Sequence, residues 1–397
     1  MRILLITETV PYPLDTGGRI KTWHTLQALA SEHEIHCHAF VRTERQRDTA
    51  AGPLSRVCSS ATLHLVPRNL PREVLHLARS FLLGLPLTVV RHYSGRVMEQ
   101  IRAECSARRI ELLYCDHLST LEYGRRLALP IVHDAHNVEH RIVQRVAAEL
   151  PHTDPRRILL SREGWLLRRY EESAYKRCAM VFAVSEVDAE TLASFAPTVP
   201  VVPVPIAVDA AALSPLQSIT RAPEVSFIGA QDWPPNADAV NYFLAEIWPR
   251  VGAAVPDARL TVVGRGEVRM KTRWSNCPSV RFTGWVDDVE PWFRRSRVMV
   301  VPLRSGSGMR VKILDAFARG IPVVATPVGI EGIAAVHGQH AAIAATPEAF
   351  AAATVRILQD SDLAESLARA ARRLALERYS VQAVGRLQLE ALRRLAS

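Results

Sequence analysis

The sequence predicts an α/β protein built from two doubly wound parallel-sheet domains, and two observations support this fold class. Short apolar runs rich in β-branched residues alternate with segments of helical periodicity along most of the chain. This alternation is typical of buried parallel strands joined by crossover helices. The chain has 397 residues, of which 48% are hydrophobic, and this content is sufficient for two cores of ordinary size.

The first half supplies six strands and at least three helices, which define an N-terminal domain over residues 1–200. Strands are expected near residues 2–7, 34–40, 62–66, 110–115, 130–134 and 179–184, and helices at 18–31, 92–105 and 155–176. Residues 201–222 are rich in Pro, Ala and Ser and lack a strong period, so we predict that they form the interdomain linker.

The second half repeats the alternation over residues 223–378, which define a C-terminal domain. Strands are expected near 224–229, 258–263, 280–283, 297–301 and 322–325, and helices beginning at Asn236, Asp287, Met309 and Glu348. Residues 379–397 are predicted to form a closing helix. Ligands of open α/β sheets bind beyond the carboxyl ends of the strands, so the loops at those ends are the first place to look for a site.

Residues 306–326 join a glycine loop to a helix and then to a buried strand, and this junction predicts an anion site. Backbone N–H groups at a helix start, here including Gly308, point toward a bound phosphate, and the helix dipole favours negative charge there. Arg310 and Lys312 add two full positive charges, which are locally unfavourable at a helix start unless an anion binds. Asp315 lies about one and a half turns inside the helix, within reach of a ribose hydroxyl.

Two further glycine positions follow predicted strands. Gly17 and Gly18 open the first long helix and permit the close backbone approach that a phosphate needs, although such a pair alone is more often a plain turn. Gly229 ends a strand and precedes Asn236, the expected N-cap of the next helix. Arg304, just before the glycine loop, is expected either to contact phosphate or to form a surface salt bridge.

Composition narrows the class of partner. The formal net charge of +9 favours an anionic partner, which leaves a nucleotide, a nucleic acid or an acidic membrane surface. We expect no nucleic acid, because no basic stretch is interleaved with stacking aromatics and aromatics make up only 6% of the chain. The six cysteines lack C-x-x-C spacing, which argues against a zinc site or a disulfide framework. With no long apolar run and no signal peptide, a cytoplasmic location is predicted.

One segment suggests contact with a membrane. Residues 70–83 alternate apolar and basic side chains at helical spacing, as an interfacial helix would. The alternative is a helix packed on the core with a solvated basic edge. Val89 to Arg102 has a similar mixture of apolar and basic residues.

Several of these segments together resemble the retaining GT-B glycosyltransferases of the family 4 type. They are the two glycine loops, Asp134-Ala135-His136-Asn137-Val138-Glu139, Phe227-Ile228-Gly229 followed by Trp233-Pro234-Pro235-Asn236, and residues 306–332. The similarity runs from Arg2 to about Tyr379 and is most specific over 306–332. It implies two Rossmann-like domains facing a cleft, a closing helix that returns to the N-terminal domain, and sugar transfer from a UDP- or GDP-sugar with retention, without cofactor or catalytic metal.

The resemblance also implies residue roles, and the chain departs from the family at three places, one of which is Pro205-Ile206-Ala207-Val208-Asp209, where the family commonly has Pro-Asn-Gly-Val-Asp. His136 is implied to hydrogen-bond the donor sugar near the reacting centre, whereas most histidines in such positions bond only to backbone. The family's E-x7-E motif has Ser307 in place of its first acidic residue and Asp315 at the second. Gln231 and Asp232 stand where many members have Arg and Lys, so the charge would come from Arg310 and Lys312.

A metal cluster and two other functions are weighed against this prediction. His133, Asp134, His136 and His140 are not expected to converge on a metal, because successive strand residues point to opposite faces. Alternative functions are a nucleotide-sugar-binding subunit with little activity, favoured by Ser307, and a nucleotide-sugar epimerase. The acceptor is predicted to be lipid-linked or a growing polysaccharide at the cytoplasmic membrane face, because the N-terminal half of GT-B enzymes usually meets the acceptor.

Overall fold

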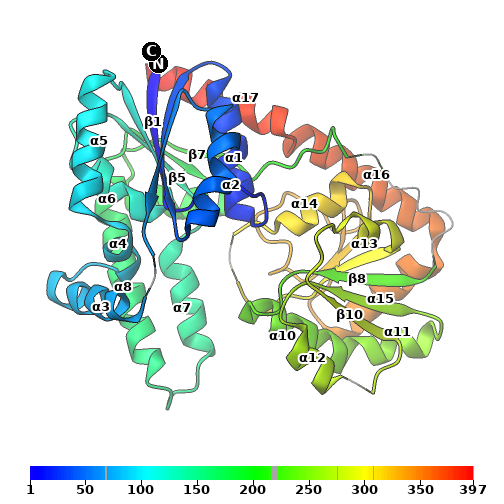
Figure 1. Ribbon diagram of the computed structural model, residues 1–397. Helices are drawn as coiled ribbons and strands as arrows, with labels where there is room; N and C mark the ends of the chain where they lie inside the picture. The colour runs from blue at the N-terminus through cyan, green and yellow to red at the C-terminus, as the bar shows by residue number, and fades with distance from the viewer. Residues whose placement is uncertain (68, 214, 216–221, 275, 307, 397) are drawn as a thin grey trace. The chain divides into compact units, whose positions relative to one another are not determined.

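The structure is a computed structural model that describes residues 1–396 except 68, 214, 216–221, 275 and 307. The chain divides into two compact units (Figure 1), one made of Met1–Ala207 with Val384–Ser397 and the other of Val208–Ala383. Both termini therefore belong to the first unit. Among the described residues, no helix has the length and the apolar content needed to cross a bilayer.

The first unit is built on a seven-stranded parallel sheet. Its strand order is β3-β2-β1-β4-β5-β6-β7, with β1 (Arg2–Thr7), β2 (Glu34–Val41), β3 (Ser60–Leu65), β4 (Leu112–Asp116), β5 (Ile131–Ala135), β6 (Met180–Ala183) and β7 (Val201–Pro203). The six predicted strands are all present. The seventh, β7, lies at the start of the stretch predicted as linker, where Val201 pairs with Val181. Proline is tolerated there because β7 is an edge strand.

Helices cover both faces of this sheet (Figure 1). They are α1 (Gly17–Ala30), α2 (Glu44–Ser55), α3 (Leu70–Leu83), α4 (Leu87–His92), α5 (Gly95–Ala107), α6 (Leu121–Gly124), α7 (Glu139–Glu149), α8 (Arg156–Tyr175), α9 (Glu186–Phe195) and α17 (Val381–Ala396). The helix predicted over 92–105 begins later, at Gly95, because Tyr93 adopts an extended conformation that separates α5 from α4. In α17, Gln388 donates to the hydroxyl of Tyr114 at 2.6 Å, which fixes that helix to β4.

The second unit has a six-stranded parallel sheet with the order β10-β9-β8-β11-β12-β13. Its strands are β8 (Glu224–Ile228), β9 (Arg259–Val263), β10 (Val280–Gly284), β11 (Val298–Val301), β12 (Val323–Ala325) and β13 (Ala342–Ile343). Five of them were predicted, and β13 has only two residues. The helices are α10 (Pro234–Tyr242), α11 (Trp248–Ala254), α12 (Glu267–Arg273), α13 (Glu290–Arg295), α14 (Val311–Ala318), α15 (Pro347–Gln359) and α16 (Ser361–Arg378), with a π-helical segment at Phe243–Ile247 between α10 and α11.

The four predicted helix starts of the second unit are displaced by one to three residues, with α13 beginning at Glu290 and not Asp287 and α15 at Pro347 and not Glu348. The other two displacements concern the candidate site. Helix α10 begins at Pro234, whose fixed φ suits the first helical position. The prediction that Asn236 is its N-cap therefore fails, and the Asn236 side chain instead donates to the carbonyl of Ala230 at 2.8 Å. Helix α14 begins at Val311 rather than Met309, with Arg310 as its N-cap residue.

Candidate functional site

Arg310 lies directly against the glycine loop that precedes α14. Its side chain is buried, and one guanidinium nitrogen donates to the carbonyl of Gly308 at 2.8 Å. A Cβ atom on Gly306 would lie 2.7 Å from another guanidinium nitrogen, and the φ of 122° at Gly306 favours glycine. The loop sequence therefore allows a positive charge to lie beside backbone N–H groups at a helix start.

Lys312 lies in the first turn of α14 and points toward the end of β8. Its Nζ atom donates to Oδ1 of Asn236 at 3.0 Å and lies 4.6 Å from the ring centroid of Phe227. Within the described part of the chain, no carboxylate forms an ion pair with it. Burial, together with the charge of Arg310, lowers the pKa of Lys312 to about 7. A bound anion would stabilise the charged form of this amine.

Gly229 lies directly after β8, at the same place. A Cβ atom at this position would lie 2.5 Å from Nζ of Lys312 and 2.9 Å from Nδ2 of Asn236. The structure thus brings together Gly229 and Lys312, which are far apart in the sequence, and adds Asn236 as the residue that connects them. The absence of a side chain at 229 leaves the room in which the amine lies.

Arg304 and Asp315, the other two side chains predicted to contact phosphate or ribose, have partners within the protein. Arg304 forms an ion pair with Asp238 of α10, with Nε 2.9 Å from Oδ2, so of its two expected roles the salt bridge is observed. Oδ1 of Asp315 lies 3.2 Å from a guanidinium nitrogen of Arg319, and burial raises the pKa of Asp315. Ser307, which replaces the family's first acidic residue, lies outside the described residues.

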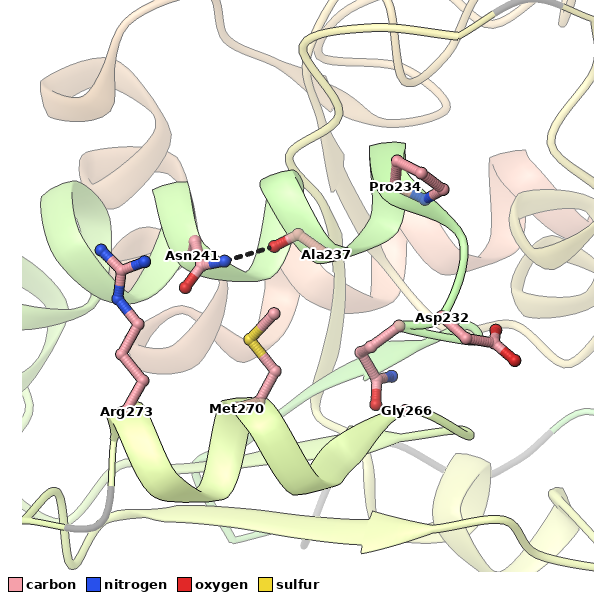
Figure 2. A pocket seen from close by; sticks show the side chains of 8 residues that line it. Asp232, Pro234, Ala237, Asn241, Gly266, Met270 and Arg273 are labelled. Carbon is pink, nitrogen blue, oxygen red and sulfur yellow. Dashed lines mark hydrogen bonds between the residues drawn. The ribbon is translucent and has the colours of Figure 1, made fainter.

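A cavity of about 680 Å³ opens between α10 and α12 (Figure 2). It is lined by Gln231, Asp232, Pro234, Ala237, Asn241, Gly266, Met270 and Arg273. None of the predicted phosphate-binding residues is among these lining residues, so the cavity lies next to the lysine site and does not contain it.

The ends of β9 and β10 carry a further feature that the sequence analysis missed. Trp285 follows β10 and is exposed, and the guanidinium carbon of Arg265 lies 5.4 Å from its ring centroid. An exposed indole beside a cation at a sheet edge offers a flat surface for an aromatic ligand. The sequence signal was a tryptophan directly after a strand.

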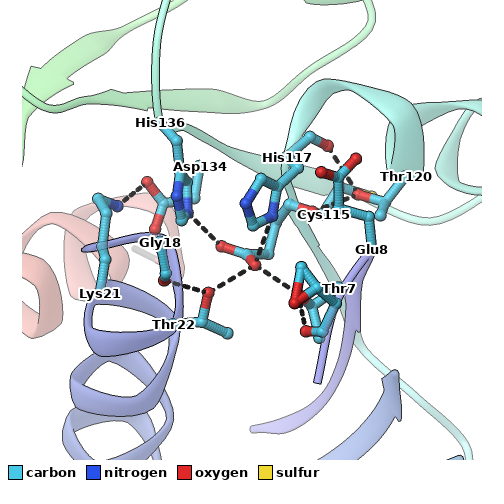
Figure 3. A network of polar contacts seen from close by, with 12 residues as sticks. Thr7, Glu8, Gly18, Lys21, Thr22, Cys115, His117, Thr120, Asp134 and His136 are labelled. Carbon is cyan, nitrogen blue, oxygen red and sulfur yellow. Dashed lines mark hydrogen bonds and ion pairs between the residues drawn. The ribbon is translucent and has the colours of Figure 1, made fainter. Parts of the chain in front are cut away.

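In the first unit, His136 lies directly after β5 and is buried. Its Nε2 atom lies 2.7 Å from Oδ1 of Asp116, at the end of the neighbouring strand β4 (Figure 3). Burial, together with the charge of His117, lowers the pKa of His136. Its partner is therefore a carboxylate and not backbone, which sets this residue apart from most buried histidines.

His117 is a site residue that the sequence analysis did not find. Its Nδ1 atom lies 2.8 Å from Oδ2 of Asp116, and its ring centroid lies 3.9 Å from that of His136 (Figure 3). Burial alone would lower the pKa of His117, but the carboxylates of Asp116 and Glu8 overcome this effect and raise it to about 10. The available signal was the pair Asp116-His117 at the end of an apolar strand.

The Gly17-Gly18 pair forms the first turn of α1 and lies under the two histidines. A Cβ atom on Gly18 would lie 3.6 Å from both Nε2 of His117 and Nδ1 of His136. Lys21, which follows the pair, points away from it and forms a buried ion pair with Asp134 (Figure 3). The positive charge next to this loop therefore comes from His117 and not from Lys21.

The four residues considered as a metal cluster in the sequence analysis have separate partners. Nδ1 of His133 bonds the carbonyl of Cys115 at 2.9 Å, and Nδ1 of His140 lies 2.6 Å from Glu171. A different group comes together instead: Asp116, His117 and His136 each offer a ligand atom, all within 4.8 Å of one another. In this group the carboxylate already faces both imidazoles.

A separate surface of the first unit exposes apolar side chains. On α3, Ser80 is the only buried residue, so the prediction of a helix packed on the core is wrong. The exposed apolar residues of α3 are Leu70, Val74, Leu75, Leu77, Phe81, Leu82 and Leu83, and α8 adds Ile158, Leu159 and Trp165. Arg162 of α8 connects the two helices, with its guanidinium carbon 3.8 Å from the ring centroid of Phe81.

The family model of the glycosyl transferases group 1 matches residues 222–360. Two curated relatives are phosphatidyl-myo-inositol mannosyltransferases. The one from Propionibacterium freudenreichii is 33% identical over 105 residues, which are 26% of this chain and 25% of the relative. The one from Mycolicibacterium smegmatis is 29% identical over 227 residues, or 54% of this chain and 57% of the relative. The matches thus span between a quarter and just over half of the relatives' own length.

Solved structures match over the whole chain. A sucrose-phosphate synthase from Thermosynechococcus elongatus superposes with a TM-score of 0.72 at 16% identity and full coverage of both chains. The Anabaena protein HepE in complex with UDP and glucose gives a TM-score of 0.68 at 14% identity, covering 99% of this chain and 100% of HepE. These likenesses confirm the predicted GT-B fold.

Proposed function

We propose that this chain, whose residues 222–360 form a domain of the glycosyl transferases group 1 on a GT-B fold, transfers a sugar from a nucleoside-diphosphate sugar to a glycan or lipid-linked acceptor. The observation that carries the proposal is the position of Arg310 and Lys312 at the glycine loop before α14. There, both cationic side chains lie beside the N–H groups of a helix start, and no carboxylate of the described residues forms an ion pair with Lys312.

The transfer proceeds with retention and without a metal ion. The bond between the anomeric carbon and the diphosphate breaks, the acceptor hydroxyl attacks the oxocarbenium-like sugar from the same face, and its proton passes to the departing diphosphate. Arg310 and Lys312, with the N–H group of Gly308, stabilise the negative charge that grows on the diphosphate. Each such preorganised donor lowers a barrier by about 2.7–4 kcal/mol. His136 orients the donor sugar through a hydrogen bond.

The donor is a UDP- or GDP-sugar. Trp285, exposed at the sheet edge of the second unit beside Arg265, supplies a surface on which a nucleobase stacks. The similar HepE structure holds UDP, and the curated relatives are named as mannosyltransferases, so both donor classes belong in the first screen.

The acceptor is lipid-linked or a growing polysaccharide, and the enzyme works in the cytoplasm, bound peripherally to the membrane. Support comes from the apolar surface of α3 and α8, which carries Arg72, Arg79 and Arg162 among its exposed leucines and aromatics. Apolar side chains that enter the acyl boundary, with arginines at headgroup level, are typical of helices that lie in an anionic membrane interface.

The test is transfer by the purified protein. UDP-glucose, UDP-N-acetylglucosamine and GDP-mannose are incubated with extracted bacterial lipids, and nucleoside diphosphate release is compared with and without acceptor. We expect acceptor-dependent release with one donor class and its loss in Lys312→Ala. Tight donor binding without transfer or donor hydrolysis would instead support a nucleotide-sugar-binding subunit, and isomerisation of the donor alone would support an epimerase.

A further inference from the structure

His117 has a backbone conformation that a histidine rarely adopts. Its φ is 73° and its ψ is 150°, immediately after the last residue of β4. This conformation is strained for a residue with a side chain and persists only where the surroundings hold it. Here the surroundings are the Asp116 carboxylate and the ring of His136. Such outliers cluster at functional sites, which makes the direction of this side chain informative.

The two histidines present one donor and one acceptor to the same point. Because Nε2 of His136 bonds the Asp116 carboxylate, we assign its proton to Nε2, which leaves Nδ1 as an acceptor. Asp116 faces Nδ1 of His117, so Nε2 of His117 is the free N–H group. Both free atoms are 3.6 Å from the Cβ position of Gly18, and within the described chain neither has a hydrogen-bond partner.

The helix start below these atoms adds further donors. The first N–H groups of an α-helix lack acceptors within the helix. Helix α1 has 14 residues, begins at Gly17 and has no acidic residue in its first turn. Above this helix start, the carboxyl groups of Asp116, Glu8 and Glu139 raise the pKa of His117 and thereby keep its imidazole positively charged. A ligand over Gly18 therefore meets a cation, unpaired N–H groups and one acceptor nitrogen.

We propose that His117 is a further substrate-contacting residue of the transfer reaction: its Nε2–H donates to an oxygen of the donor diphosphate, while Nδ1 of His136 accepts from a hydroxyl of the sugar. A glycosyl diphosphate carries both groups, a phosphate oxygen on its anomeric carbon and a hydroxyl on the next carbon. An unsubstituted sugar lacks the anion, and inorganic phosphate lacks the sugar ring that carries the hydroxyl. The inference rests on the proposed function and assigns part of the donor to the first unit.

The test uses two substitutions at His117 and one control. His117→Gln removes the charge, and His117→Gly also relieves the backbone, since glycine adopts positive φ freely. Arg109→Gly is the control, because exposed Arg109 also has a positive φ, of 52°. We expect both His117 variants to lower kcat by about a hundredfold or more, as the loss of an oxyanion donor does. We expect Arg109→Gly to keep wild-type kcat. His117→Gly should have a higher Tm than His117→Gln.

Two readouts separate this inference from the proposed function. If the wild-type protein turns over and both His117 variants keep kcat within twofold, the inference is wrong and the function stands. If the wild-type protein turns over no donor, the proposed function fails, and pyrophosphate becomes the probe. The rise in Tm that pyrophosphate causes should then be smaller in His117→Gly than in the wild type, and an equal rise would overturn the assignment of His117.

Discussion

Nζ of Lys312 lies 3.0 Å from Oδ1 of Asn236, so the amine at the start of α14 is held by a neutral amide from the start of α10. A carboxylate at this place would neutralise the lysine and repel a phosphate. The amide instead fixes the position of the Lys312 amine without neutralising it. Because the amine is buried, a bound anion raises its pKa strongly.

Lys312→Ala should lower kcat by about a hundred- to a thousandfold, because it removes a positive charge from the departing diphosphate. The folded state should keep its stability, since a buried ammonium without a carboxylate partner contributes little to folding. Lys271→Ala, an exposed lysine of the same unit, is the control and should leave kcat unchanged. Steady-state kinetics and urea unfolding of both variants check this, and near-normal transfer by folded Lys312→Ala would contradict the diphosphate assignment.

Affinity for a UDP-sugar should weaken as the pH rises above about 7. The pKa of Lys312 is about 7 without ligand, and a bound diphosphate raises it because an opposite charge favours the ammonium. Below that pH the amine is already charged, whereas above it binding must take up a proton. A UDP-sugar is suitable because its diphosphate diester does not titrate in this range. Calorimetry between pH 6 and 9 should show proton uptake that Lys312→Ala lacks, and equal pH dependence in both proteins would refute the role of Lys312.

Gly229→Ala should impair activity through Lys312. The new Cβ atom would lie 2.5 Å from Nζ of Lys312, and the far end of that flexible side chain would move out of its position. We expect kcat to fall about tenfold or more, since small displacements at a reacting centre have large effects. Gly252→Ala in α11 is the control: nothing lies within 4 Å of its Cβ, so it should stabilise the fold by about 0.5–1 kcal/mol. Equal activity of the two variants would be evidence against the contact.

Glu104→Gln should destabilise the first unit more at neutral pH than in acid. The hydrogen bond from His38 lowers the pKa of Glu104 to about 2, from an ordinary value of 4.5. The ionised carboxylate thus stabilises the fold fully above pH 4.5, and this contribution is lost as the pH falls from 4.5 toward 2. We expect a loss of about 1–3 kcal/mol at pH 7. Urea unfolding at pH 3 and 7 checks it, with exposed Glu99→Gln of the same helix as control; a difference that is as large at pH 3 as at pH 7 would contradict it.

The protein should bind anionic vesicles more tightly than neutral ones, through α3. Each basic residue near an anionic surface contributes about 1 kcal/mol, and salt screens it. Changing Arg72 and Arg79 to Glu should therefore abolish sedimentation with phosphatidylglycerol vesicles. The same change at two other exposed arginines, Arg45 of α2 and Arg56 directly after it, alters the net charge equally and should have less effect. Equal and negligible binding to both lipid types would remove the membrane proposal and favour a soluble acceptor.

The fold could be predicted because most strands are continuous apolar runs between helical segments. The strand β1 was predicted at its observed bounds, since all of its residues after Arg2 are buried. The strand β7 was missed because its three residues lie between prolines, and only pairing with β6 makes them a strand. The π-helical segment at Phe243–Ile247 has an ordinary helical pattern, so nothing local distinguishes it from α10.

Candidate site residues could be proposed where a motif surrounds them, but their neighbours could not. Gly229 and Lys312 were proposed from separate glycine loops, whereas the amide of Asn236 that joins them was assigned to a helix cap. His117 was missed for a related reason. Its role depends on Asp116 beside it, His136 on the next strand and Glu8 after β1, and sequence spacing does not reveal contacts among three strand ends.

The position of Gln388 also sets an order for folding during synthesis. Its amide donates to the hydroxyl of Tyr114, 274 residues earlier in the chain, and that hydroxyl in turn donates to Asp134, the partner of Lys21. On the ribosome, all of Val208–Ala383 is made before Gln388 emerges. The second unit is therefore complete as a continuous segment while the first still lacks α17. A nascent first unit exposes the α1 and β4 residues that α17 will cover, so this unit can complete its core only after the second unit has been made.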